Sequence, residues 1–128
     1  MIKLVSILNE IRPRGAATFI IKPTKWGGDI SSPELNIKMY YFVNEHSAVI
    51  DVASDYDLMR TLGRRFGDGP YDDDEEDYYY PVDESAYFCD NNLHHFKNFF
   101  GEAKVQLDGY NCSQIVIPIE LFNKKIKK

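Results

Sequence analysis

The sequence predicts a single α+β domain, an antiparallel sheet of about five strands with helices on one face. Polar and apolar residues alternate along Leu35 to Val43, which indicates a half-buried strand. Strand-like runs joined by short turns indicate hairpins, and hairpins build antiparallel sheets. Two helical patterns are grouped in the middle of the chain. With 128 residues and 44% hydrophobic residues, the chain has the size and apolar content of one domain covering residues 1–128.

The first third of the chain is expected to form a helix, a strand and a loop. Residues 2–11 have apolar positions at helical spacing, and Pro13 stops the pattern. Residues 16–22 are expected to form the first strand. Residues 24–33 are rich in Gly, Ser and Pro and are expected to be a loop that carries the single tryptophan, Trp26. Trp26 either covers an edge of the core or belongs to a mobile contact loop.

The next elements are a hairpin and a helix. The strand at 35–43 has two faces. One face consists of Leu35, Ile37, Met39, Tyr41 and Val43, and the other of Asn36, Lys38, Tyr40 and Phe42. A short turn, in which His46 is an exposed histidine, leads to a strand at 48–53. A helix is expected to follow, with Ser54 as its N-cap and Gly67 after its last turn. Its buried stripe consists of Leu58, Leu62 and Phe66.

The last third is expected to hold a helix, a second hairpin and a basic tail. Asp90 is expected to cap a helix that runs to Phe100, with a buried stripe of Cys89, Leu93, Phe96 and Phe100. Strands are expected at 103–107 and 114–117, joined by a turn at Asp108-Gly109. Pro118 indicates that the second strand lies at a sheet edge or ends there. Residues 123–128 form the basic tail.

Negative charge is concentrated in one part of the sequence. Residues 66–96 contain ten of the 20 acidic residues and no Lys or Arg, so the remaining chain has ten acids and 15 bases. The formal charge of -5 is therefore -10 in this window and +5 elsewhere. Six consecutive carboxylates at 72–77 repel one another, which favours a solvated loop between two helices. The acidic, tyrosine-rich loop is assigned to residues 72–84.

Aromatic residues in and beside this loop indicate contact with a partner. Tyrosine gives a large contact area at low entropy cost, and aromatic rings stack on guanidinium groups. Carboxylates next to rings suit a basic protein surface, such as that of a nuclease or another nucleic-acid-binding protein, and no direct binding of nucleic acid is expected. The alternatives are a solvated loop whose tyrosines pack on the body, and a divalent-cation site without a recognisable motif. The predicted contact residues are Tyr71, Asp72, Asp73, Asp74, Glu75, Glu76, Asp77, Tyr78, Tyr79, Tyr80, Asp83, Glu84 and Trp26.

The sequence favours a binding protein over an enzyme. It contains no Gly-x-Ser-x-Gly, His-Glu-x-x-His or P-loop motif, and no cofactor or catalytic residue is predicted. A small hydrolase or a metal-binding enzyme remains the alternative, with Cys89, His94, His95 and Cys112 as conceivable ligands. Two cysteines do not form a disulfide framework, and no apolar run is long enough to cross a membrane, so the expected compartment is the cytoplasm.

The opening MIKLVSILNEIRP resembles the N-termini of many small proteins encoded by tailed phages, which often begin with a short amphipathic helix. The resemblance covers about a tenth of the chain. It implies a virion component or an accessory protein that acts in the host cytoplasm. Two functions follow as hypotheses: an inhibitor that covers a basic surface of a host or competitor protein, and a virion structural or assembly protein.

Overall fold

The computed structural model describes residues 17–65 and 81–126. Within these ranges the chain forms six strands and three α-helices, in an α+β arrangement. The strands are β1 (Ile20–Pro23), β2 (Gly27–Ser32), β3 (Ile37–Val43), β4 (Ser47–Asp51), β5 (Lys104–Leu107) and β6 (Ser113–Pro118). The helices are α2 (Tyr56–Arg65), α3 (Val82–Phe100) and α4 (Ile119–Ile126), and a 3₁₀ turn, η1 (Val52–Ser54), precedes α2. The helix predicted at residues 2–11 lies outside the described residues.

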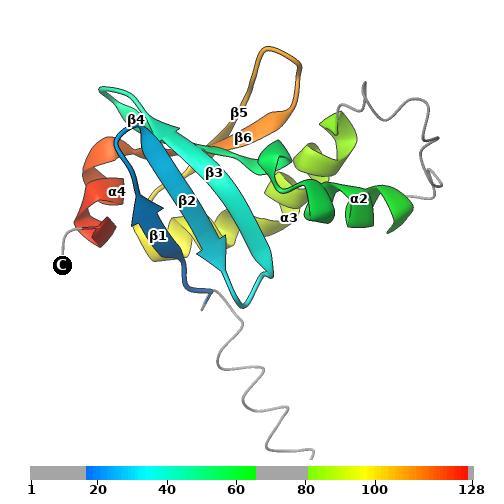
Figure 1. The fold of residues 1–128 in the computed structure, drawn as a ribbon, viewed down its shortest axis with the longest axis horizontal. Coiled ribbons are helices and arrows are strands. Elements are labelled where there is room, and N and C mark those ends of the chain that lie inside the picture. Colours follow the sequence, from blue (N-terminus) through cyan, green and yellow to red (C-terminus); the bar gives the residue numbers. More distant parts are fainter. Residues whose placement is uncertain (1–16, 66–80, 127–128) are drawn as a thin grey trace, which may run out of the picture.

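The described strands form one antiparallel sheet in the order β1-β2-β3-β4-β6-β5 (Figure 1). The first four strands follow one another as a meander, and β6 then joins β4. Strand β6 is therefore an interior strand, and Pro118 is its last residue. The prediction that the strand ends at Pro118 is confirmed, and the alternative that this strand lies at a sheet edge is wrong.

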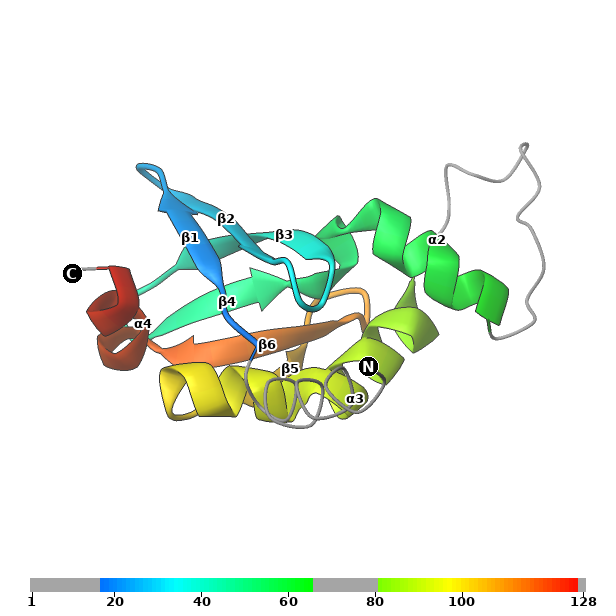
Figure 2. The same ribbon diagram turned by 90° about the horizontal axis from the view of Figure 1, so that it is seen from below.

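Helix α3 runs beneath the sheet, while α4 and α2 lie toward opposite ends of it (Figure 2). One sheet face packs on α3 and α4 because its apolar side chains alternate inward, as Met39 and Tyr41 do on β3. Phe96 is fully buried in this layer, and its ring stacks on Phe19 with centroids 4.5 Å apart. Phe100 and Phe122 stack in the same way at 5.4 Å and join α3 to α4.

The loop predicted at 24–33 is wrong for residues 27–32, which form β2. Residues such as Gly27, Gly28 and Asp29 have low strand propensity, so the local sequence does not indicate a strand. Pairing decides the structure instead, because β2 hydrogen-bonds to β1 on one side and to β3 on the other. Gly28 has φ +150°, and a Cβ at this position would lie 2.2 Å from the carbonyl oxygen of Lys22. Only glycine fits this close approach of two backbones.

The predicted start of the helix that follows β4 is displaced by one residue. Ser54 was expected as the N-cap, but the Oδ1 atom of Asp55 accepts the hydrogen bond from the Leu58 amide at 3.0 Å. The hydroxyl of Ser54 accepts a hydrogen bond from the Tyr40 amide at 2.9 Å instead. The buried side of α2 contains Met59 and Leu62, with Leu58 partly buried. Phe66 lies outside the described residues.

The helix that was predicted to run from its cap at Asp90 to Phe100 begins eight residues before Asp90. Helix α3 starts at Val82, after Pro81 at its N-cap, and it ends at Gly101 with φ 105°, as the sequence predicts. Asp83 and Glu84 therefore belong to its first turn and not to the acidic loop assigned to 72–84. Acidic side chains are favoured at this place, because the N-terminal end of a helix carries partial positive charge. The predicted stripe is confirmed for Cys89, Phe96 and Phe100, with Leu93 partly buried.

The basic tail assigned to 123–128 is also corrected. Residues 123–126 form the last part of α4, with Lys124 and Lys125 in its final turn. Lysines are favoured there by the partial negative charge at a helix C-terminus. The β5–β6 connection lies where the sequence predicts it, but it spans residues 108–112, and Asn111 has the positive φ, 68°, that the two-residue turn would place at Gly109. The Oδ1 atom of Asp108 accepts hydrogen bonds from the Tyr110 and Cys112 amides. Among the described helices, none is long and apolar enough to cross a membrane.

Candidate binding surface

The face of the sheet opposite α3 presents exposed aromatic side chains, and none of the described helices lies over it (Figure 2). Tyr40 and Phe42 point to this face from β3, with exposed fractions of 64% and 46%. Trp26, in the turn before β2, is 76% exposed. Trp26 therefore does not cover the core edge, and its ring is accessible for contact. Exposed apolar side chains that gather in one patch mark interaction surfaces more often than single ones do.

Strand register places a carboxylate on each side of Tyr40. Asp29 on β2 is the direct cross-strand partner of Tyr40, and Asp51 on β4 is its partner on the other side. Directly paired residues in antiparallel strands have Cβ atoms about 5 Å apart and share a face. The row Asp29, Tyr40, Asp51 thus sets an aromatic ring between two acids. Gly27 lies opposite Phe42 and contributes no side chain.

These residues surround a shallow hollow of about 440 Å³, called here the sheet-face pocket. Its aromatic walls come from the β1–β2 turn and from β3, and its acids come from β2 and the end of β4. The pocket is lined by Thr24, Trp26, Gly27, Gly28, Asp29, Tyr40, Tyr41, Phe42 and Asp51. Tyrosine, tryptophan and carboxylate side chains together form an environment that favours a cation.

The two acids of the pocket differ in their surroundings. Burial raises the pKa of Asp51, and the nearby charge of Asp108 raises it further, while a hydrogen bond from the backbone of Ala53 acts in the opposite direction. Asp51 is thus a half-buried carboxylate with excess negative charge around it. Lys22 pairs in register with Asp29. Among the described residues, however, no ion pair within 4.0 Å involves Asp29 or Asp51.

A cation already lies near one ring of the pocket. The Nζ atom of Lys25 is 5.2 Å from the centroid of the Trp26 ring, within the range of a cation–π interaction. Lys25 and Trp26 are both exposed, so this contact is surrounded by water and contributes about 0.5–1 kcal/mol. The contact indicates that the face of Trp26 is open to a positive group.

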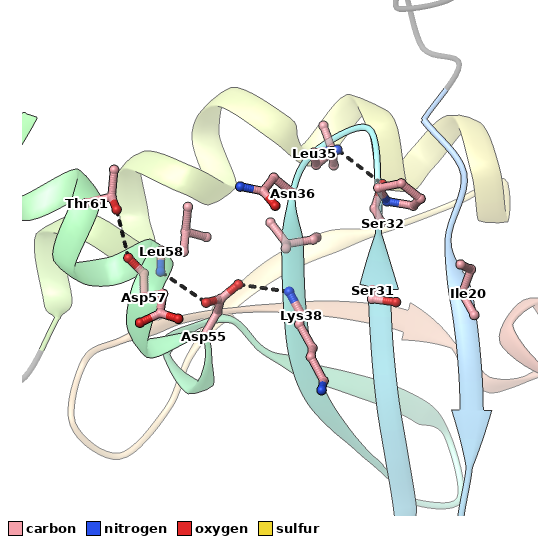
Figure 3. Close-up of a pocket in the computed structure, with 12 residues that line it drawn as sticks. Ile20, Ser31, Ser32, Leu35, Asn36, Lys38, Asp55, Asp57, Leu58 and Thr61 are labelled. Atoms are coloured by element: carbon pink, nitrogen blue, oxygen red, sulfur yellow. Dashed lines mark hydrogen bonds between the residues drawn. The ribbon is translucent and has the colours of Figure 1, made fainter.

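A second groove, of about 520 Å³, lies between α2 and the ends of β2 and β3 (Figure 3). Its buried carboxylate, Asp55, is fully engaged, because Oδ1 accepts from the Leu58 amide and Oδ2 accepts from the Lys38 amide at 2.8 Å. The hydroxyl of Thr61 donates to the carbonyl oxygen of Asp57. These polar groups hold the fold together, and the groove offers little chemistry of its own.

Of the cysteines and histidines named in the metal alternative, His94 and His95 lie beside each other with ring centroids 4.0 Å apart, and both cysteines are buried. Burial raises the pKa of Cys89 to about 12, and burial together with Asp108 raises the pKa of Cys112. Both shifts disfavour the reactive thiolate at neutral pH. Burial and the neighbouring His94 lower the pKa of His95. Within the described ranges, no three His, Cys, Asp or Glu side chains gather closely enough to hold a metal ion.

The predicted contact residues fall into three groups. Residues 71–80 lie outside the described part of the chain. Asp83 is exposed on α3, whereas Glu84 is only 3% exposed, so its carboxylate does not belong to an open acidic surface. Trp26 lies in the sheet-face pocket, together with Asp29, Tyr40 and Asp51, which the sequence did not single out. The alternation along β3 assigned Tyr40 to a face, but only the strand register reveals its acidic neighbours.

Comparison of the chain with protein-family models, with curated proteins and with solved structures found no match.

Proposed function

We propose that this chain is a non-enzymatic binding protein that docks on a basic surface of a partner protein and acts as an inhibitor. The sheet-face pocket carries the proposal, since it sets Trp26, Tyr40 and Phe42 beside two carboxylates on a face that α2, α3 and α4 do not cover. Aromatic anchors are the residues that most often dominate the energy of protein interfaces. The adjacent acids favour a partner rich in Arg and Lys.

The charge distribution of the sequence supports the same kind of partner. Ten acids lie between residues 66 and 96 without a single Lys or Arg. A concentrated negative charge attracts a basic protein over a distance of about one Debye length, roughly 8–10 Å at physiological salt. Such steering accelerates association, while close contacts set the dissociation rate. In this proposal the acidic segment 72–77 steers the partner and the sheet-face pocket holds it.

The resemblance of the opening residues to small tailed-phage proteins suggests the setting. An accessory protein made inside a bacterial host would meet basic nucleases and nucleic-acid-binding proteins of that host or of competitors. Covering the basic surface of such a protein would block its access to nucleic acid, and would require no catalysis by this chain.

The proposal is tested by affinity capture from bacterial lysate, with the wild type beside a variant in which Asp72 to Asp77 are replaced by serine. Each bait is used at about 50 mM and about 200 mM salt, and the captured proteins are identified by mass spectrometry. We expect the wild type to enrich basic proteins at low salt, and both the variant and the higher salt to reduce that enrichment several-fold. Equal capture by both baits at both salt concentrations contradicts the proposal, and a large homo-oligomer without captured protein would favour the assembly hypothesis.

A further inference from the structure

We propose that the sheet-face pocket binds the guanidinium group of an arginine side chain presented by the partner. This inference rests on the proposed function and deepens it, because it names the group that the basic partner inserts. Three properties of the pocket carry it: the aromatic faces, the placement of the two acids, and the glycine backbone along one side.

The aromatic faces suit a flat cation better than a compact one. A guanidinium is planar and weakly hydrated, so it stacks on an aromatic ring and keeps its edge free for hydrogen bonds. Trp26 and Tyr40 are both more than half exposed and line one hollow from different elements, the β1–β2 turn and β3. The Lys25 ammonium near Trp26 is exposed and weakly held, so an arriving guanidinium can replace it without breaking a buried contact.

The carboxylates of Asp29 and Asp51 can accept hydrogen bonds from the edge of a planar cation that stacks on the Tyr40 ring. Asp29 and Asp51 are the direct cross-strand partners of Tyr40 on its two sides. Neighbouring strands are about 4.8 Å apart, so the acids approach the ring from opposite directions. A guanidinium has five N–H donors in a fixed fork and can donate to both acids, whereas an ammonium is a compact point charge.

The local charge also favours an incoming cation. Asp51 is half-buried, and Asp108 adds a second negative charge near it. No ion pair within 4.0 Å neutralises Asp29 or Asp51 among the described residues. A carboxylate held in this way gains more from a positive partner than a fully solvated one does, because less water competes for it.

One side of the pocket is formed by the backbone of two glycines. Gly27, opposite Phe42, and Gly28 contribute no side chains to the hollow. Neither position tolerates a Cβ, which would lie 2.1 Å from the carbonyl oxygen of Tyr41 at Gly27 and 2.2 Å from that of Lys22 at Gly28. The backbone geometry that joins β2 to its neighbours thus keeps this side of the pocket free of side chains.

Trp26 supplies the assay, because it is the only tryptophan of the chain and it lines the pocket. The full chain is titrated with the tripeptide Gly-Arg-Gly, and the fluorescence of Trp26 is recorded. Gly-citrulline-Gly has nearly the same shape without the charge, and Gly-Lys-Gly has the charge without the planar fork. We expect Gly-Arg-Gly to bind with a dissociation constant of roughly millimolar size, Gly-Lys-Gly several-fold more weakly, and the citrulline peptide not measurably.

Substitutions assign the binding to the pocket. Asp29→Asn and Asp51→Asn are each expected to weaken Gly-Arg-Gly binding about five- to tenfold, since each removes one charge-assisted contact. Tyr40→Ala removes the stacking ring and should weaken binding similarly, whereas Tyr40→Phe keeps the ring and should bind like the wild type. Asp57 is exposed on α2, away from the pocket, so Asp57→Asn is the matched control and should leave Gly-Arg-Gly binding unchanged. Circular dichroism verifies that each variant is folded.

Two results would overturn the inference: the same fluorescence change with the arginine and citrulline peptides, or wild-type affinity in folded Asp29→Asn and Asp51→Asn. Repeating the lysate capture with Tyr40→Ala separates this inference from the proposed function. Undiminished capture of basic proteins by Tyr40→Ala would sink the pocket assignment and leave standing only the part of the proposed function that names a basic partner. Selective arginine binding without capture of any basic protein would sink the proposed function and leave the pocket assignment standing.

Discussion

Replacement of Asp55 provides a direct test of how the sheet is completed where β4 ends. Strand β4 pairs with β3 only from Tyr40 to Val43, so the amide of Lys38 has no strand partner on that side. The Asp55 Oδ2 atom accepts from this amide at 2.8 Å, while Oδ1 accepts from the Leu58 amide at 3.0 Å. The carboxylate of Asp55 therefore has two roles: it accepts from the β3 amide that β4 does not reach, and it caps α2.

The expected loss of stability follows from these two contacts. Removing an aspartate N-cap costs about 0.5–2 kcal/mol. A hydrogen bond to a charged group contributes about 1.5–3 kcal/mol, and the part-buried bond from the Lys38 amide is assigned the lower end of that range. Asp55→Ala should therefore lower the free energy of unfolding by about 2–4 kcal/mol. Asp55→Ser keeps an oxygen for the cap but is too short to reach the Lys38 amide, so about half of that loss is expected.

Urea unfolding followed by circular dichroism measures this effect. With an m-value of about 1.5 kcal/mol per molar urea, the expected loss lowers the midpoint by roughly 1.5–2.5 M. Asp57→Ala removes a neighbouring acid in the first turn of α2 that makes no such bridge, and it should cost less than about 1 kcal/mol. Equal midpoints for Asp55→Ala and Asp57→Ala would refute the double role of Asp55.

Four further outcomes are expected. Phe96→Ala should lower the free energy of unfolding by about 3–5 kcal/mol in a denaturant titration, because a fully buried ring leaves a cavity. Gly28→Ala should lower it by about 2 kcal/mol or more, because its Cβ would lie 2.2 Å from a backbone oxygen of β1. Burial raises the pKa of Asp51 in the folded protein. Its contribution to stability is therefore greatest below the ordinary pKa of aspartate and is lost as pH rises through the raised pKa. Asp51→Asn should melt at a higher temperature than the wild type at pH 7, but not near pH 3. Burial raises the pKa of Cys89 to about 12, so this thiol should resist iodoacetamide at pH 8 in the folded protein and react after unfolding.

Local patterns in the sequence predicted those elements whose side chains repeat on one face. The period-two alternation of β3 and the helical stripe from Cys89 to Phe100 are dictated by neighbours in sequence. The alternation is confirmed from Ile37 to Phe42 but not at Val43, which is exposed at the end of the strand, and the stripe is confirmed. The predicted end of the helix at Phe100 is also confirmed, because Gly101 follows it with φ 105°, a conformation that favours glycine. The α+β class and the antiparallel sheet followed from these patterns.

The missed elements depend on partners that lie far away in the sequence or on a misread charge pattern. Strand β2 has no repeating pattern of its own and exists because β1 and β3 pair with it. The start of α3 was hidden because Asp83 and Glu84 extend a run of acids, although Pro81 followed by acidic residues is a helix-start signal. The sheet-face pocket required the register between Asp29, Tyr40 and Asp51, which no local pattern contains.

The pairing of β4 with β6 has a consequence for the speed of folding. Ile50 pairs with Ile115, 65 positions later (115 minus 50), whereas each earlier strand pairs with the next one along the chain. Contacts between distant residues form slowly, since a long loop must close first. The six consecutive acids at 72–77 lie inside that loop, and their mutual repulsion expands the unfolded chain and opposes closure. Added salt screens this repulsion and should therefore accelerate the formation of the native sheet during refolding.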